Sequence, residues 1–255
     1  MTKYETLNIE IGEYVATVTI DRPPVNAMST QLCRDLTSTF DELSDNPEVR
    51  VVILTSKGRI FCAGRDLKEA VKQPHEQRNR QVRAMYAAQY HCAVPVIGAI
   101  NGPAIGAGNS LALFCDILIA SDTATFSLPE INHGLSGGFA TTRRGLNAYQ
   151  GRKLYFTGEA ASAEDFHRMG IVDSVVNSEA LMQSARELAL SLAAKPPLAM
   201  RAAKWTAKEV DKIPDLERAY QAIEERTNLF LLHTEDHKEA VAAFVEKRPG
   251  KFVGR

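Results

Sequence analysis

The most informative stretch of this sequence is Asn101-Gly102-Pro103-Ala104-Ile105-Gly106-Ala107-Gly108. It follows an apolar run from Val94 to Ile100 that is typical of a buried strand, and it precedes a short apolar segment, Asn109 to Phe114, that predicts a helix. A glycine-rich turn between a strand and a helix leaves the first N–H groups of the helix without internal acceptors. The stretch is therefore predicted to aim backbone N–H groups at a small ligand, as an enzyme does.

Strands and helices alternate around this turn. Residues Leu7 to Ile20 alternate between apolar and polar around Gly12-Glu13, which predicts a β-hairpin, and Ser29 can cap a helix that runs toward Leu43. Two more buried strands and five later helices are predicted from the apolar spacing, at Val51–Leu54, Ile117–Ala120, Ser162–Met169, Ser178–Ala194, Leu198–Val210, Asp215–Leu232 and Glu235–Val245. The sequence thus predicts an α/β fold whose last third is nearly all helix.

Composition excludes several classes of protein. The 255 residues are 45% apolar and 24% charged, and no stretch approaches the roughly 18 apolar residues of a membrane span. A net charge of -1 provides no basic field for nucleic acid. The first residues, Met1 to Glu10, lack the apolar region of a secretory signal, so a cytoplasmic location is expected. Four widely spaced cysteines are expected to be buried reduced thiols: Cys33, Cys62, Cys92 and Cys115.

Two other segments can carry chemistry. The first, Arg59-Ile60-Phe61-Cys62-Ala63-Gly64-Arg65-Asp66-Leu67, lies a short loop after a buried strand, and Gly64 allows a tight turn into a helix start. Two such turns can together form a two-donor oxyanion hole. The second, Leu128-Pro129-Glu130-Ile131, places one carboxylate among apolar residues, where burial can raise the pKa toward that of a useful acid or base. Each pattern alone is more often structural, but their order and combination favour a catalytic site.

These motifs together resemble the crotonase, or enoyl-CoA hydratase/isomerase, superfamily. The resemblance rests on F-C-A-G-R-D-L at Phe61 to Leu67, N-G-P-A-I-G-A-G at Asn101 to Gly108, C-D at Cys115-Asp116 and P-E at Pro129-Glu130. Later segments, Tyr155 to Glu159, Gly170 to Asp173 and Ala243 to Arg248, match the family's usual spacing, so the resemblance covers essentially the whole chain. It implies an enzyme, a lyase of this family that acts on acyl-CoA thioesters.

The resemblance also implies an architecture. Residues 1–194 are expected to form a crotonase-like ββα spiral core that holds the acyl-CoA site. Residues 195–255 are expected to form a helical C-terminal region that mediates a homotrimer or a dimer of trimers. The two prolines of Lys195-Pro196-Pro197 mark the expected boundary.

Residue roles follow from the same resemblance. It assigns the two oxyanion-hole N–H groups to Arg65 and Ala107, which would hold the thioester oxygen, and it makes Glu130 the acid/base. Coenzyme A enters as part of the substrate, and no separate cofactor or metal is expected. The segment from Lys68 to His91 and the C-terminal helices are expected to shape the acyl pocket. Residues assigned to substrate or CoA binding are Ala27 at the end of the loop from Arg22, Ala63, Gly64, Asp66, Leu67, Lys68, Gly106, Gly108, His133 and, from a neighbouring subunit, Lys247.

The chain departs from typical family hydratases at Ser110. Those enzymes carry two active-site carboxylates; Glu130 matches the second, whereas Ser110 occupies the position of the first. Ser110 could still hold a water through its hydroxyl, or it could merely satisfy its own backbone. Hydration of a 2-enoyl-CoA is the leading hypothesis. The alternatives are a hydratase-lyase of the hydroxycinnamoyl-CoA type, an enoyl-CoA isomerase, an acyl-CoA decarboxylase and a non-catalytic acyl-CoA-binding subunit.

Two other motifs suggest rival chemistry but lack the right context. Gly134-Leu135-Ser136-Gly137-Gly138 matches the G-x-S-x-G elbow of serine hydrolases, yet it is not expected to follow a buried strand directly. His233 and His237 are spaced like two metal ligands on a helix, but H-T-E-D-H is not H-E-x-x-H. We therefore expect neither a serine nucleophile nor a metal site.

Overall fold

The computed structural model describes residues 4–70, 74–143 and 145–255; residues 1–3 of the N-terminal segment and residues 71–73 of the expected pocket-shaping segment lie outside the described residues. The strands are β1 (Leu7–Gly12), β2 (Val15–Ile20), β3 (Val51–Ser56), β4 (Val96–Ile100), β5 (Ala104–Ile105), β6 (Ile117–Ser121), β7 (Thr125–Ser127), β8 (Ala161–Ser162) and β9 (Ser174–Val176). The helices are α1 (Thr30–Asp45), α2 (Leu67–Ala70), α3 (His75–His91), α4 (Ala107–Leu113), α5 (Phe139–Thr142), α6 (Ala148–Thr157), α7 (Ala163–Arg168), α8 (Leu181–Ala193), α9 (Pro197–Val210), α10 (Leu216–Ala219), α11 (Glu225–Leu231) and α12 (Glu235–Glu246), with a 3₁₀ turn η1 (Pro129–His133) and a π-helical segment η2 (Tyr220–Glu224).

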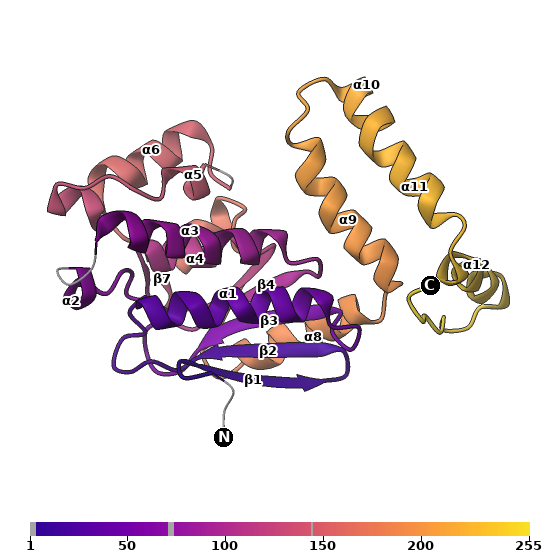
Figure 1. Ribbon diagram of the computed structural model, residues 1–255, viewed down its shortest axis with the longest axis horizontal. Coiled ribbons are helices and arrows are strands. Elements are labelled where there is room, and N and C mark those ends of the chain that lie inside the picture. The colour runs from indigo at the N-terminus through magenta and orange to yellow at the C-terminus, as the bar shows by residue number, and fades with distance from the viewer. Residues whose placement is uncertain (1–3, 71–73, 144) are drawn as a thin grey trace.

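The main sheet has the strand order β1-β2-β3-β4-β6-β9. The hairpin of β1 and β2 is antiparallel, and every following pair is parallel. Parallel neighbours require helical crossovers, and the chain supplies them between these strands. Figure 1 shows α1 and α3 lying over one face of the sheet. This arrangement confirms the predicted α/β class.

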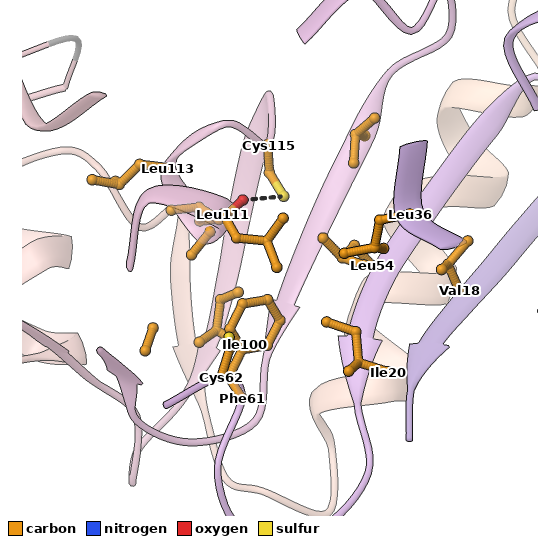
Figure 2. Close-up of a cluster of buried hydrophobic side chains, with 14 of the residues drawn as sticks. Val18, Ile20, Leu36, Leu54, Phe61, Cys62, Ile100, Leu111, Leu113 and Cys115 are labelled. Atoms are coloured by element: carbon orange, nitrogen blue, oxygen red, sulfur yellow. Dashed lines mark hydrogen bonds between the residues drawn. The ribbon is translucent and has the colours of Figure 1, made fainter. Parts of the chain in front are cut away.

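Both faces of the central strands are covered, which explains their uninterrupted apolar sequences. Val52 and Leu54 of β3 pack into the larger core, whereas Val51 and Ile53 point to a second cluster against α8. Figure 2 shows the larger core, where side chains from the strands meet those of the helices and of the segment before the glycine turn. Labelled members include Val18, Ile20, Leu36, Leu54, Phe61, Cys62, Ile100, Leu111, Leu113 and Cys115.

Helix α1 follows the sequence prediction closely. The Ser29 side chain accepts a hydrogen bond from the N–H of Leu32, which satisfies a donor at the helix start. Leu32, Leu36 and Phe40, each four residues apart, are fully buried against the sheet. Their burial anchors the helix next to the loop from Arg22 to Ala27, which forms part of the candidate active site described below.

A smaller sheet, in the order β5-β7-β8, lies beyond the end of β4. It was not predicted, because its strands are only two or three residues long. The neighbouring α4 begins at Ala107, two residues before the expected start, because Gly106 with φ +55° ends the extended backbone there. The small sheet therefore ends directly at the glycine turn.

The C-terminal helices α9–α12 extend away from the sheet, as Figure 1 shows in orange and yellow. Buried Lys204 of α9 holds them to the core, donating to the C=O of Val94 at 2.7 Å and pairing with Asp116 at 2.6 Å. The predicted helix over Asp215–Leu232 is interrupted by η2. Among the helices described, none is long and apolar enough to cross a membrane.

Candidate active site

The two predicted turns lie side by side. Cys62 and Ala104 form a parallel bridge, and the N–H of Ile105 donates to the C=O of Cys62 at 2.9 Å. A Cβ atom placed on Gly64 would lie 2.7 Å from the Ile105 oxygen and 3.5 Å from the nitrogen of Ala107. Parallel pairing of the two extended segments thus brings both turns to the same level. The structure joins residues that are some 40 positions apart in sequence.

Each turn presents one N–H group that the fold does not use. The N–H of Met28 donates to Gly64, and the C=O of Met28 accepts from Asp66, so this pairing passes over the N–H of Arg65. Ala107 is the first residue of α4, where an N–H has no partner within the helix. Within the described ranges, neither the Arg65 N–H nor the Ala107 N–H has an acceptor. Two adjacent free donors are what an oxyanion hole requires.

Glycine is needed at two positions of the second turn. A Cβ on Gly108 would lie 2.2 Å from the Cys62 carbonyl oxygen, and only a shift of the backbone could relieve this overlap. A Cβ on Gly106, whose φ is +55°, would lie 2.5 Å from Oε1 of Glu130. The missing side chains therefore allow α4, the first turn and Glu130 to approach one another closely.

Glu130 lies against this second turn. It follows β7 on η1, and the N–H of Gly106 donates to Ser127 at 2.8 Å, which ties the turn to that strand. Its Oε2 atom is buried and has no hydrogen-bond partner among the described residues. Burial raises the pKa of Glu130, and its own backbone N–H and the charges of Arg65 and His133 only partly oppose this effect. The carboxyl is thus suited to exchange a proton.

Asp66 fixes the first turn. It accepts hydrogen bonds from the N–H of Lys68 at 2.9 Å and from the Arg22 guanidinium at 2.7 Å. Burial acts to raise the pKa of Asp66, but these bonds and the N–H of Glu69 outweigh it, so the pKa is lowered. Arg22 also donates to the C=O of Ala27 at 3.0 Å. The loop that ends at Ala27 and the turn at Asp66 therefore form one unit.

Ser110 is buried on α4, three residues beyond Ala107, and its hydroxyl lies 3.0 Å from Oγ1 of Thr141 on α5. Ser110, Thr141 and Tyr86 on α3 form a group of three hydroxyls. Tyr86 was not predicted from the sequence, and its hydroxyl donates to the C=O of Ala107 at 2.7 Å. Burial raises the pKa of Tyr86 further above its ordinary value, and a hydrogen bond with Ser110 opposes this. No sequence pattern pointed to Tyr86 as a member of this group.

The remaining residues assigned to substrate or CoA binding differ in where they lie. Leu67 and Lys68 begin α2 and are exposed, and His133 is exposed at the end of η1. Ala63 precedes the first turn, and its N–H donates to Val25. Lys247 caps α12, which Figure 1 places at the opposite end of the molecule from α2. Within one chain, the structure does not bring Lys247 to this site.

Rival chemistries find no support in the surrounding structure. The segment with Ser136 follows the turn η1 and not a strand, unlike a nucleophile elbow. Burial raises the pKa of Cys62 to about 11, which keeps it a thiol. His233 is exposed and lies before α12, so it does not share a helical face with His237. In the portion of the chain described, no three His, Cys, Asp or Glu side chains are grouped to hold a metal ion.

Comparisons with known proteins identify the family of this chain. Residues 10–255 match the family model described as enoyl-CoA hydratase/isomerase. A carnitinyl-CoA dehydratase from Proteus mirabilis is 34% identical, covering 98% of this chain and 99% of its own. A (7aS)-7a-methyl-1,5-dioxo-2,3,5,6,7,7a-hexahydro-1H-indene-carboxyl-CoA hydrolase from Rhodococcus jostii is 36% identical over 82% of this chain and 83% of its own.

Among solved structures, an enoyl-CoA hydratase from Bacillus anthracis superposes with a TM-score of 0.93 at 30% identity, covering 98% of this chain and 100% of that one. The match extends over the sheet, both turns and the C-terminal helices. Fold, site geometry and sequence similarity lead to one conclusion: this chain belongs to the enoyl-CoA hydratase/isomerase family and has the crotonase fold.

Proposed function

We propose that this enzyme adds water reversibly across the 2,3-double bond of a 2-enoyl-CoA. The observation that carries the proposal is the position of Glu130, whose carboxylate lies against Gly106 with one buried oxygen unpartnered in the described structure. The unused N–H group of Ala107 is on the residue after Gly106, and the first turn, which carries the unused N–H group of Arg65, approaches Ala107 through Gly64. One acid/base next to two backbone donors is the minimum that this reaction needs.

In this mechanism, the two N–H groups donate to the thioester oxygen of the bound substrate. When water adds to C3, negative charge moves through C2 to this oxygen and forms an enolate. A preorganised donor of this kind is worth about 3–4 kcal/mol in comparable sites. Backbone donors suit the task because they are already aimed and need no reorganisation.

Glu130 moves the proton. Its carboxylate takes a proton from the water as the oxygen bonds to C3, and the resulting acid then delivers a proton to C2 of the enolate. One carboxyl can serve both steps because it ends in the form in which it began. The raised pKa of Glu130 helps the second step, since a carboxylic acid of moderate strength is easier to form beside an enolate. Ser110 holds the water through its hydroxyl.

The binding of the CoA portion is part of the same proposal. The loop from Arg22 to Ala27 and Lys68 are assigned to the CoA portion, and Lys247 to its phosphates from a neighbouring subunit.

The proposal also divides the chain by role. Residues 1–194 act as the catalytic core and residues 195–255 as the oligomerisation region of a homotrimer or dimer of trimers. Exposed Leu229, Phe230 and Phe244 on the C-terminal helices support association. Four buried free cysteines support the inferred cytoplasmic location.

Crotonyl-CoA tests the proposal. The wild-type enzyme is expected to remove the conjugated enoyl absorbance, and Glu130→Gln, which keeps the shape but removes the basic oxygen, is expected to stop this loss. Glu179→Gln changes an exposed glutamate and serves as the control. A fully active Glu130→Gln enzyme would show that another group moves the proton.

A hydratase-lyase is the second candidate, and Ser110 in place of a second carboxylate is the observation that favours it. Such an enzyme would hydrate a hydroxycinnamoyl-CoA and then break the C2–C3 bond, releasing acetyl-CoA and an aromatic aldehyde. Release of the aldehyde, monitored through the absorbance of the aldehyde itself, would favour this candidate. Stable accumulation of 3-hydroxyacyl-CoA would favour simple hydration.

A further inference from the structure

Three hydroxyl groups from three helices meet at the start of α4. Tyr86 comes from α3, Ser110 from α4 and Thr141 from α5. Thr141 and Ser110 are buried, and the Tyr86 ring stacks on Phe114 with its centroid 4.8 Å away. Buried hydroxyls need partners, so the direction of each O–H bond is constrained by its neighbours.

Both outer hydroxyls use their hydrogen on a backbone carbonyl. Tyr86 donates to the C=O of Ala107 at 2.7 Å, and Thr141 donates to the C=O of Gly138 at 2.8 Å. Each hydroxyl has only one hydrogen. Neither outer residue therefore has a hydrogen left for the hydroxyl between them.

Ser110 is consequently the donor within this group. Its single hydrogen goes to one of its two neighbours, and Oγ1 of Thr141 lies 3.0 Å from the Ser110 hydroxyl oxygen. The lone pairs of its oxygen then receive no hydrogen from Tyr86 or Thr141. Ser110 is left as a hydrogen-bond acceptor, which is the role that a carboxylate would play at the same position.

Resting on the proposed function, we propose that Tyr86 and Thr141 are positioning residues that hold Ser110 as the acceptor for the O–H group on C3 of a 3-hydroxyacyl-CoA. In the hydration direction, the same oxygen accepts from the water that adds. The substrate class is thus defined by a neutral O–H donor at C3. Tyr86 has a second effect, because it also holds Ala107, whose N–H is an oxyanion donor.

The test compares the affinities of two CoA thioesters that differ in one hydroxyl. Calorimetry on a Glu130→Gln enzyme, which would not turn over, would measure binding of 3-hydroxybutyryl-CoA and of butyryl-CoA. Adding Thr141→Val is expected to weaken 3-hydroxybutyryl-CoA binding about three- to tenfold, the range for one hydrogen bond, and to leave butyryl-CoA binding unchanged. Ser110→Ala should have the same selective effect, and Thr141→Ser should restore the wild-type preference.

Thr142→Val is the matched control. Thr142 is also buried and also donates to the C=O of Gly138, at 2.9 Å, but within the described ranges no hydrogen bond joins its hydroxyl to Ser110. It should leave the ratio of the two affinities unchanged. If Thr141→Val weakens both thioesters equally, or neither, Thr141 does not set the role of Ser110 and the proposal fails.

Tyr86→Phe tests the other arm, because it keeps the stacked ring and removes only the hydroxyl. With crotonyl-CoA, kcat is expected to fall about tenfold while KM changes less than about twofold, since the hydrogen bond from the Ala107 N–H stabilises mainly the transition state. Unchanged kcat would overturn the role of Tyr86. The affinity measurements need no turnover, so an enzyme inactive on crotonyl-CoA would count against the proposed hydration and leave the hydroxyl preference to be judged separately.

Discussion

The turn around Gly64 and the turn around Gly106 lie side by side and both are closely packed, since a Cβ on Gly64 would lie 2.7 Å from the Ile105 oxygen, but only the first also depends on a set of polar contacts at Asp66. Asp66 accepts from Arg22 and from two backbone N–H groups. Close packing holds the second, since Gly106 and Gly108 touch Glu130 and Cys62 where any Cβ would overlap them. One polar contact can be removed while the others remain, whereas a single added carbon atom would overlap the atoms packed against the glycines. The two turns should therefore respond differently to substitution.

Gly108→Ala should have the largest effect. The new Cβ would lie 2.2 Å from a backbone oxygen, so α4 must shift and the Ala107 N–H must leave its position. Loss of one oxyanion donor costs about 100- to 1000-fold in kcat, and overpacking costs about 1–3 kcal/mol in stability. Steady-state kinetics and denaturant unfolding would measure both.

Gly12→Ala is the matched control for this change, because no atom lies within 4 Å of the point that its new Cβ would occupy and its φ is not positive. It should leave kcat and unfolding unchanged. A Gly108→Ala enzyme with normal kcat would show that the second turn tolerates a side chain and would contradict the role given to close packing.

Asp66→Ala should have a smaller effect on the first turn. It removes the partner of Arg22 and of two N–H groups but introduces no overlap. A loss of about 1.4 kcal/mol in positioning corresponds to a tenfold drop in kcat/KM. Lys57→Ala, which breaks the exposed pair with Asp21, is the control and should change nothing measurable. Equal kinetics for the Asp66 and Lys57 variants would show that Asp66 does not hold the first turn.

The two carboxyls should also respond to pH with opposite signs. The pKa of Asp66 is lowered below its ordinary 3.8, so its ionised form stabilises the fold above that pH, and the contribution is lost as the pH falls through the lowered value. Thermal unfolding of Asp66→Asn should therefore occur below the wild-type temperature at pH 7, with a gap that narrows in acid. A gap independent of pH would contradict the shift.

Glu130→Gln should have the smallest effect on stability, in the opposite direction. Because the pKa of Glu130 is raised above its ordinary 4.5, ionisation costs stability as the pH rises from that value through the raised pKa. The glutamine variant should unfold at or slightly above the wild-type temperature at pH 7 and match it near pH 4. A clearly less stable variant at pH 7 would mean that the ionised carboxylate supports the fold.

The helices and strands of the fold could be predicted from the sequence better than the contacts between them. The apolar period of α1, the hairpin and the buried strands follow local rules that a single sequence displays. The start of α4 and the small sheet were missed, because both depend on backbone pairing between segments far apart in the chain, such as Cys62 with Ala104. Boundaries that tertiary contacts set cannot be read from local spacing.

The candidate site shows the same division. The glycines and Glu130 could be proposed from the sequence because their residue types are restricted by close approach and by charge. Tyr86 and Thr141 were missed, since an aromatic residue on a helix and a threonine after a glycine loop have ordinary structural explanations. Only the bonds to Ala107 and Gly138 reveal how they act on Ser110.

The central claim is that the N–H groups of Arg65 and Ala107 donate to one thioester oxygen. Infrared difference spectroscopy of butyryl-CoA carrying ¹³C at the thioester carbonyl, bound to Glu130→Gln enzyme, tests it directly. We predict a C=O stretch at clearly lower frequency than in water, and a smaller shift when Gly108→Ala is added. A frequency equal to that of the free thioester would contradict the claim.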